Sequence, residues 1–170
     1  GLIGSDVFSN ISYSCALGNS TSISEDYGYA GGLVGAIWGT NIDNSFAMSD
    51  VSASEAAGGL IGVIIYNSSV NASYAIGNIT GRTYAGGLVG WIDDFWEAPP
   101  TYTDCGYCDL GANIGAIEGE GDNNILSLNS SELNAKIDII ANQMNLMART
   151  QTSDLVSHTG TAAGIAGIAL

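Results

Sequence analysis

The sequence predicts a mainly β protein: a short β-solenoid of repeats of about 28 residues, followed by a C-terminal α-helix and an apolar tail. Three observations predict this fold class. A glycine-rich phrase recurs along the chain, a second landmark follows each copy at a nearly constant distance, and helical spacing replaces both after residue 124. We expect residues 1–124 to form the repeat domain, with a divergent last unit from about 91, and residues 125–170 to form the helix and tail.

The recurring phrase is GGLVG or GGLIG. Its copies occupy residues 31–35, 58–62 and 86–90, with a shortened GLIG at residues 1–4. From the glycine before one leucine to the next, the steps are 31, 27 and 28 residues, counted at Gly1, Gly32, Gly59 and Gly87. A fixed period of this size is typical of solenoids, in which one unit cannot bury its apolar side alone and stacks on its neighbours. Glycine permits the tight turns and the close approach of coils that stacking needs.

The second landmark is an apolar residue followed by alanine, at Cys15, Phe46 and Tyr74. It lies 14, 14 and 15 residues after the marker glycine of its unit. Each unit thus has two apolar segments of four to seven residues, bounded by Gly, Ser and Asn, and such segments favour strands. We expect stacking to align two files of side chains in one continuous core: Leu33, Leu60 and Leu88, and Cys15, Phe46 and Tyr74. An irregular glycine-rich sandwich is the alternative.

These repeats resemble the GLUG-motif repeat. The resemblance rests on the phrase AGGL[VI]G combined with a segment of the form N-x-S-[YF]-A-x-G-x-[IV], and residues 70–90 (VNASYAIGNITGRTYAGGLVG) follow it almost letter for letter. It extends from residue 1 to about 110, where TDCGYCD at 103–109 is similar to the variant that closes such arrays. GLUG-motif repeats are typical of large secreted or surface proteins of bacteria and archaea, including adhesin-like chains. The resemblance implies a β-solenoid-like stalk or display module and names no catalytic residue.

The chain is strongly acidic, with 17 Asp and Glu against 3 Lys and Arg and a formal net charge of −14. This charge argues against nucleic-acid binding, because phosphate recognition needs basic side chains, and against an anionic membrane surface. A solvated acidic coat, cation binding and a high-salt habitat remain open. The sequence has no 18-residue apolar run and begins without an initiator Met or a signal peptide, so we expect a mature or excised segment.

Six Asn-x-Ser/Thr sequons favour an N-glycosylated outer edge of the solenoid, in an extracellular or cell-surface protein. They stand at Asn10, Asn19, Asn67, Asn71, Asn78 and Asn129. Several recur at matching places in the repeat, Asn10 with Asn67 and Asn19 with Asn78. The alternative is that Asn and Ser are the turn residues that this fold requires. Both interpretations place these side chains at the surface.

The three cysteines allow one local disulfide. Cys105 and Cys108 form a C-x-x-C pair, and without a second pair or a βαβ context this pair indicates neither a zinc site nor a redox motif. We expect a disulfide between them in an oxidising setting, with free thiols as the alternative. Cys15 is expected to be a small buried apolar residue, and an intermolecular bridge through it remains open.

Two short segments are candidate ligand sites. Glu118, Glu120 and Asp122, spaced among glycines, offer the oxygen ligands that Ca²⁺ prefers, and a solvated acidic loop is the alternative. We expect no other cofactor. A glycan-binding platform would combine aromatic rings with carboxylates, at Trp91, Phe95, Trp96, Asp93 and Asp94. The alternative is a capping loop that shields the last coil and ends at Pro99 and Pro100.

Residues 131–150 are expected to form an amphipathic helix. Its apolar side chains at helical spacing are Leu133, Ile137, Ile140, Met144 and Met147. The tail that follows is small and apolar, and its candidates for an assembly contact are Ile165, Ile168 and Leu170. Three interpretations stay open: the tail caps its own solenoid, docks into a neighbouring subunit, or begins an anchor.

Together these features predict an extracellular structural subunit or surface-display module that self-assembles into a filament, stalk or surface layer. Its expected partner is a second copy of itself, with glycans or a host or neighbouring cell surface as further partners and no nucleic acid. The alternatives are a glycan-binding adhesin module and the non-catalytic stalk of a larger surface protein. We expect no enzyme, because the single histidine, His158, lies far from any nucleophile signature.

Overall fold

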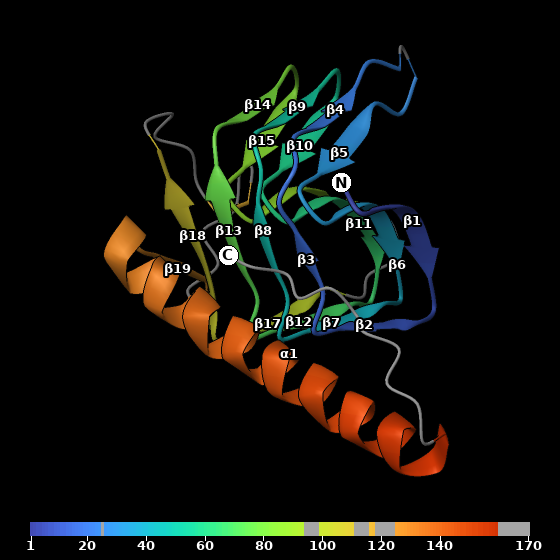
Figure 1. The fold of residues 1–170 in the computed structure, drawn as a ribbon. Helices are drawn as coiled ribbons and strands as arrows, with labels where there is room; N and C mark the ends of the chain where they lie inside the picture. The colour runs from blue at the N-terminus through green and yellow to red at the C-terminus, as the bar shows by residue number, and fades with distance from the viewer. Residues whose placement is uncertain (25, 94–98, 111–115, 118–124, 160–170) are drawn as a thin grey trace.

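The computed structural model is a β-solenoid of about four turns with one C-terminal helix, so the predicted mainly β fold class is confirmed (Figure 1). It describes the chain apart from residues 25, 94–98, 111–115, 118–124 and 160–170. Every strand pair within this described part is parallel. The spacing of about 28 residues between coils agrees with the period of the glycine-rich phrase.

Each of the first three coils contains five short strands. The first coil consists of β1 (Ile3–Val7), β2 (Asn10–Ser12), β3 (Cys15–Ala16), β4 (Ser20–Ser22) and β5 (Tyr29–Gly31). The second consists of β6 (Val34–Trp38), β7 (Asn41–Asp43), β8 (Phe46–Met48), β9 (Val51–Ala53) and β10 (Ala56–Gly58). The third consists of β11 (Ile61–Tyr66), β12 (Ser69–Asn71), β13 (Tyr74–Gly77), β14 (Ile79–Gly81) and β15 (Tyr84–Gly86). After them come β16 (Val89–Ile92), β17 (Thr101–Thr103), β18 (Cys105–Asp109) and β19 (Ile125–Ser127).

Stacking aligns the strands of successive coils into five sheets. Three sheets enclose the core, in the orders β1-β6-β11-β16, β17-β12-β7-β2 and β19-β18-β13-β8-β3. The other two, β14-β9-β4 and β15-β10-β5, form a projection that we call the arm, and it rises at the top of Figure 1. A separate small cluster fills the arm: Ala30, Val51, Ala53, Ala57 and Ile79. In every sheet the strand from the first coil stands at one edge.

The first predicted file of side chains lies in the solenoid core. Leu33, Leu60 and Leu88 are fully buried in the cluster that fills the interior. Their neighbours Val34, Ile61 and Val89 begin the strands of one enclosing sheet and are buried in the same cluster. The glycine-rich phrase therefore turns each coil and carries its central core residue, as predicted.

The second predicted file, Cys15, Phe46 and Tyr74, is aligned in register but does not lie in that core. Successive residues of a strand point to opposite faces, and the alanines that follow the landmark residues, Ala47 and Ala75, face the interior. Phe46 and Tyr74 therefore point outward and form a second cluster beneath the C-terminal helix. The prediction of one continuous core was wrong, because the strand pattern alone does not show that a helix covers this outer face.

One corner of the solenoid adopts a left-handed backbone conformation in each coil. Its residues are Tyr13, Asn44, Ala72 and Asp104, with φ angles of 48°, 46°, 43° and 48°. The residue after the corner closes it by a hydrogen bond: the Ser73 hydroxyl, for example, donates to the Asn71 carbonyl oxygen 2.8 Å away. Asn and Asp adopt this conformation readily, whereas it costs alanine about 1 kcal/mol.

Replacing Ala72 by asparagine is expected to stabilise the protein by about 0.5–1 kcal/mol, because Asn tolerates the left-handed conformation that Ala72 holds at a φ of 43°. The reciprocal change, Asn44→Ala, is expected to lower the free energy of unfolding by a similar amount, since Asn44 occupies the same corner with a φ of 46°. Urea unfolding of the two variants measures both effects. A destabilised Ala72→Asn variant would show that packing at the corner outweighs the backbone strain.

The C-terminal helix α1 (Ser130–Thr159) begins at the predicted place and continues beyond the predicted residues 131–150. Asn129 caps it: its Oδ1 accepts hydrogen bonds from the backbone N–H groups of Ser131 and Glu132, each at 3.0 Å. The Asn129 N–H in turn donates to Glu132 Oε2 at 3.1 Å, which completes a capping box. In the part of the chain that the structure describes, no helix combines the length and apolar character needed to cross a membrane.

Helix α1 crosses the outer face of the sheet β19-β18-β13-β8-β3 and runs along the stacking direction (Figure 1). Leu133, Ile137 and Ile140 are buried against Phe46 and Tyr74, as the predicted helical spacing requires. The 30 residues of the helix span roughly 45 Å, whereas the five strands of this sheet span about 20 Å. The helix therefore extends past the first coil, and Figure 1 shows its C-terminal half beyond β3.

Candidate ligand-binding surface

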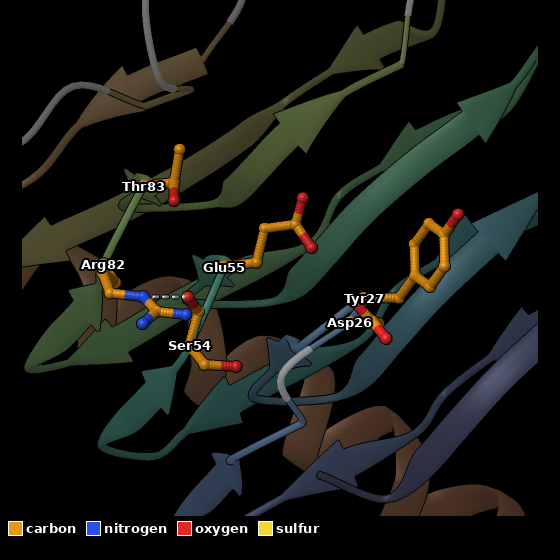
Figure 2. A pocket seen from close by; sticks show the side chains of 6 residues that line it. All are labelled: Asp26, Tyr27, Ser54, Glu55, Arg82 and Thr83. Atoms are coloured by element: carbon orange, nitrogen blue, oxygen red, sulfur yellow. Dashed lines mark hydrogen bonds between the residues drawn. The ribbon is translucent and has the colours of Figure 1, made fainter.

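The tips of the arm form an open groove. Three successive turns build it: β4 to β5, β9 to β10, and β14 to β15. The first turn spans residues 23–28, whereas the other two span only 54–55 and 82–83. The longer turn supplies Asp26 and Tyr27. The lining of the groove among the described residues is Asp26, Tyr27, Ser54, Glu55, Arg82 and Thr83 (Figure 2).

Hydrogen bonds between coils hold the three turns together. Arg82 Nε donates to the Ser54 carbonyl oxygen at 2.9 Å (Figure 2). The Ser54 hydroxyl donates to the carbonyl oxygen of Ser24 in the first coil. The backbone N–H of Glu55 donates to the Gly28 carbonyl oxygen at 3.1 Å. The side chains that line the groove are therefore carried by a connected backbone rather than by three independent loops.

Four aromatic rings, which we call the aromatic row, continue from the groove: three tyrosines of the arm and Trp91 of the adjacent strand β16. Tyr27 contacts Tyr29 edge-on, with ring centroids 6.1 Å apart. Tyr29 lies 6.2 Å from Trp91, and Trp91 stacks on Tyr84 with centroids 5.2 Å apart and planes at 6°. Tyr29 and Tyr84 both pair with Ala56 in the sheet, so a small residue stands between them. Because Trp91 contacts both tyrosines, its ring lies over this position, where Ala56 is fully buried.

Carboxylates lie beside the aromatic row. Burial raises the pKa of Tyr29 to about 12, and the charge of Glu55 contributes next, followed by Tyr27 and Asp93. The Tyr29 phenol therefore keeps its proton at neutral pH and remains a hydrogen-bond donor. Since Tyr27 and Glu55 belong to the groove as well, the groove and the aromatic row form one continuous surface.

This surface offers binding chemistry. The hydroxyls of Ser54 and Thr83, the guanidinium of Arg82 and the carboxylates of Asp26 and Glu55 supply both donors and acceptors. The aromatic faces alongside supply apolar area. Within the described residues, no group of three or more His, Cys, Asp or Glu is arranged to hold a metal ion. The predicted calcium ligands lie outside the described residues: Glu118, Glu120 and Asp122.

The predicted glycan platform is described only in part. Trp91 lies in the aromatic row, and Asp93 is close enough to act on Tyr29. The other members lie outside the described residues: Asp94, Phe95 and Trp96. Sequence reasoning missed Tyr29 and Tyr84, which the structure brings to Trp91. A signal was present, since both tyrosines precede the same letters AGG in their units.

The predicted glycosylation residues lie largely at the surface. Asn10, Asn19, Asn67, Asn78 and Asn129 are exposed, and Asn71 is half-buried. Some bond to the neighbouring coil: Asn71 Nδ2 donates to Asp43 Oδ1 at 2.7 Å. In the same way Asn78 Nδ2 donates to Asp50 Oδ1 at 3.0 Å. These hydrogen bonds between coils give Asn71 and Asn78 a structural role, and glycosylation stays a prediction.

The predicted disulfide between Cys105 and Cys108 is not formed in the structure. Cys105 faces the core, where its Sγ lies 3.2 Å from the Val70 carbonyl oxygen. Cys108 lies on the opposite face, beneath α1, in the cluster that Cys15 also joins. The prediction was wrong because residues three apart in one strand point to opposite faces of the sheet and cannot be bridged.

A second candidate surface is the outer side of the first coil, which we call the open edge. Each of its strands, β1 to β5, ends its sheet, and no further strand of the described residues lies beside them. Large apolar side chains of this coil that are more than half exposed are Leu2, Val7, Leu17 and Ile23. At the opposite end the chain continues, since β19 pairs with β18 and the Val89 N–H donates to the Ala116 carbonyl oxygen at 3.1 Å.

The predicted assembly residues of the tail lie outside the described residues: Ile165, Ile168 and Leu170.

Comparisons with protein-family models, with curated proteins and with solved structures found no match. The resemblance to the GLUG-motif repeat therefore stays a prediction that rests on the sequence pattern. The class of protein that the fold defines is a short parallel β-solenoid, with an open edge at its first coil and an aromatic and acidic face on its arm.

Proposed function

We propose that the chain is a structural subunit or surface-display module that self-associates, with the open edge of one copy stacked on a coil of a second copy. One observation carries the proposal: all five strands of the first coil end their sheets while their coil exposes large apolar side chains. The proposal places the assembly at the cell surface or outside the cell, as a filament, stalk or surface layer, and assigns it no reaction.

The physics of strand edges supports stacking at this place. An edge strand presents backbone N–H and C=O groups that pair readily with another chain, and monomeric β proteins block such edges with lysine, proline or bulges. The first coil at the open edge instead exposes residues such as Val7 and Leu17. Successive coils of this chain pair in one parallel register in the enclosing sheets, and the strands of a second copy would add to the open edge in the same way.

Helix α1 supports the same arrangement. The helix extends past the first coil, so a copy stacked on the open edge would lie beside its C-terminal half (Figure 1). Exposed sequons such as Asn10 and Asn78 would then point to solvent from the outside of the assembly.

Electron microscopy and light scattering of the purified chain at moderate salt test the proposal. The expected result is elongated oligomers or filaments whose mass grows with concentration. Leu17→Lys places a charge at the open edge and is expected to shift the particles to monomers. The matched variant Met48→Lys places the same charge on the second coil, where Met48 is 40% exposed, and is expected to leave assembly intact. A monomer at all concentrations of the unchanged chain would contradict the proposal.

A further inference from the structure

We propose that the arm carries a saccharide-binding site, in which the aromatic row packs against the faces of sugar rings and the groove binds their hydroxyl groups. The site belongs to the arm and does not depend on self-association at the open edge. Its ligand class is a neutral oligosaccharide or polysaccharide that lies along the arm.

The aromatic row has the shape that a chain of sugar rings needs. Pyranose rings expose C–H groups on their faces, and these pack on the electron-rich faces of aromatic side chains. Tyr84 and Trp91 are stacked with their planes at 6°, so each covers part of one face of the other and they hold each other's orientation before any ligand arrives. Tyr29 continues the row at a 45° tilt, and Tyr27, 78% exposed, ends it at the groove. The row thus presents several ring surfaces in sequence instead of one.

The groove at the end of the aromatic row offers both donors and acceptors for hydrogen bonds with sugar hydroxyls. The carboxylates of Asp26 and Glu55 accept, the Arg82 guanidinium donates, and the Thr83 hydroxyl does either. Figure 2 shows that these side chains rise from adjacent turns and border one space. The Arg82 Nε bond to the Ser54 carbonyl oxygen fixes the guanidinium beside this space. A ligand that covered Tyr27 would reach the groove directly.

An organic cation is the competing ligand class, because aromatic faces and carboxylates also attract ammonium and guanidinium groups. The groove favours the saccharide for a specific reason. Arg82 stands among the lining residues, so a cation in the groove would meet a fixed positive charge as well as the carboxylates of Asp26 and Glu55. A neutral ligand rich in hydroxyls uses the guanidinium and the carboxylates together.

Tryptophan fluorescence titrations with cellohexaose, chitohexaose and mannan test the proposal, with oligolysine as the cationic probe. We expect at least one saccharide to shift the Trp91 emission and to bind equally in low and high salt. Tyr84→Ala is expected to weaken this binding roughly tenfold, since it removes one stacked ring. Glu55→Gln keeps the shape of the groove and is expected to weaken binding without a change in the melting temperature.

The matched control is Tyr66→Ala. Tyr66 lies in another aromatic group, 6.3 Å from Phe8 and 6.1 Å from Trp38, so the variant loses the same side chain away from the arm. It is expected to bind saccharide like the unchanged chain. Equal weakening by Tyr66→Ala and Tyr84→Ala would overturn the proposal, and so would no saccharide binding by the unchanged chain. Binding of oligolysine alone, lost at high salt, would overturn it in favour of a cation site.

Discussion

Replacing Gly59 by alanine is expected to destabilise the solenoid by about 3 kcal/mol or more, enough to prevent folding of a marginally stable domain. An added Cβ at Gly59 would overlap the carbonyl oxygen of Gly87 in the next coil and would lie 2.8 Å from the Ala75 Cβ. The Gly87 oxygen is a backbone atom, and the Ala75 Cβ is attached directly to the backbone. Neither atom can move away unless the backbone of the solenoid moves. The neighbouring position Gly32 meets the same obstacles one coil earlier, from Gly59 and Ala47.

The matched control for this prediction is Gly4→Ala. An added Cβ at Gly4 meets no atom within 4 Å, although Gly4 belongs to the first copy of the same phrase. This variant is expected to keep or slightly raise the stability, because alanine restricts the unfolded chain. Circular dichroism during thermal unfolding compares the two variants. A folded Gly59→Ala variant with an unchanged melting temperature would mean that the coils are not in van der Waals contact at this point.

The contrast between these two glycines shows why the repeat could be predicted from the sequence. Each stacked coil meets the same steric demand, so the phrase recurs wherever one coil lies on another. Leu60 comes directly after Gly59 in the phrase, and its predicted burial in the core is confirmed. The five strands of each coil could not be predicted in the same way. Strands such as β4 and β9 are three residues long and contain Ser or Thr, so they carry no apolar period that distinguishes them from turns.

The candidate ligand-binding surface was predicted at Trp91 and the nearby Asp93, and otherwise missed. Tyr27 and Tyr29 stand far from Trp91 in the sequence, and only the register of the arm places Tyr29 and Tyr84 on either side of Ala56. The groove depends on the additional length of the turn at residues 23–28. In the sequence that turn resembles any polar loop, and its position over the two shorter turns follows from the stacking of coils.

The outer cluster beneath α1 leads to the second large effect. Replacing Leu133 by alanine is expected to cost about 3 kcal/mol, because Leu133 is fully buried between the helix and the solenoid. The remaining contacts cannot replace it. Lys136 pairs with Asp104 at 2.7 Å and lies 5.7 Å from the centre of the Tyr74 ring. Both charged side chains are more than a third exposed, so this ion pair contributes at most about 1 kcal/mol.

The loss of Leu133 is expected to act on the helix first and on the coils second. Helix α1 contributes no residue to the buried cluster inside the solenoid. It does cover the outward-facing side chains of Phe46 and Tyr74. Hydrogen exchange should therefore accelerate in α1 at temperatures where the coils remain protected. Ile139→Ala removes an aliphatic side chain from the exposed side of the same helix, at 58% exposure, and should leave exchange unchanged. If both variants loosen α1 equally, the helix does not dock through its Leu133 face.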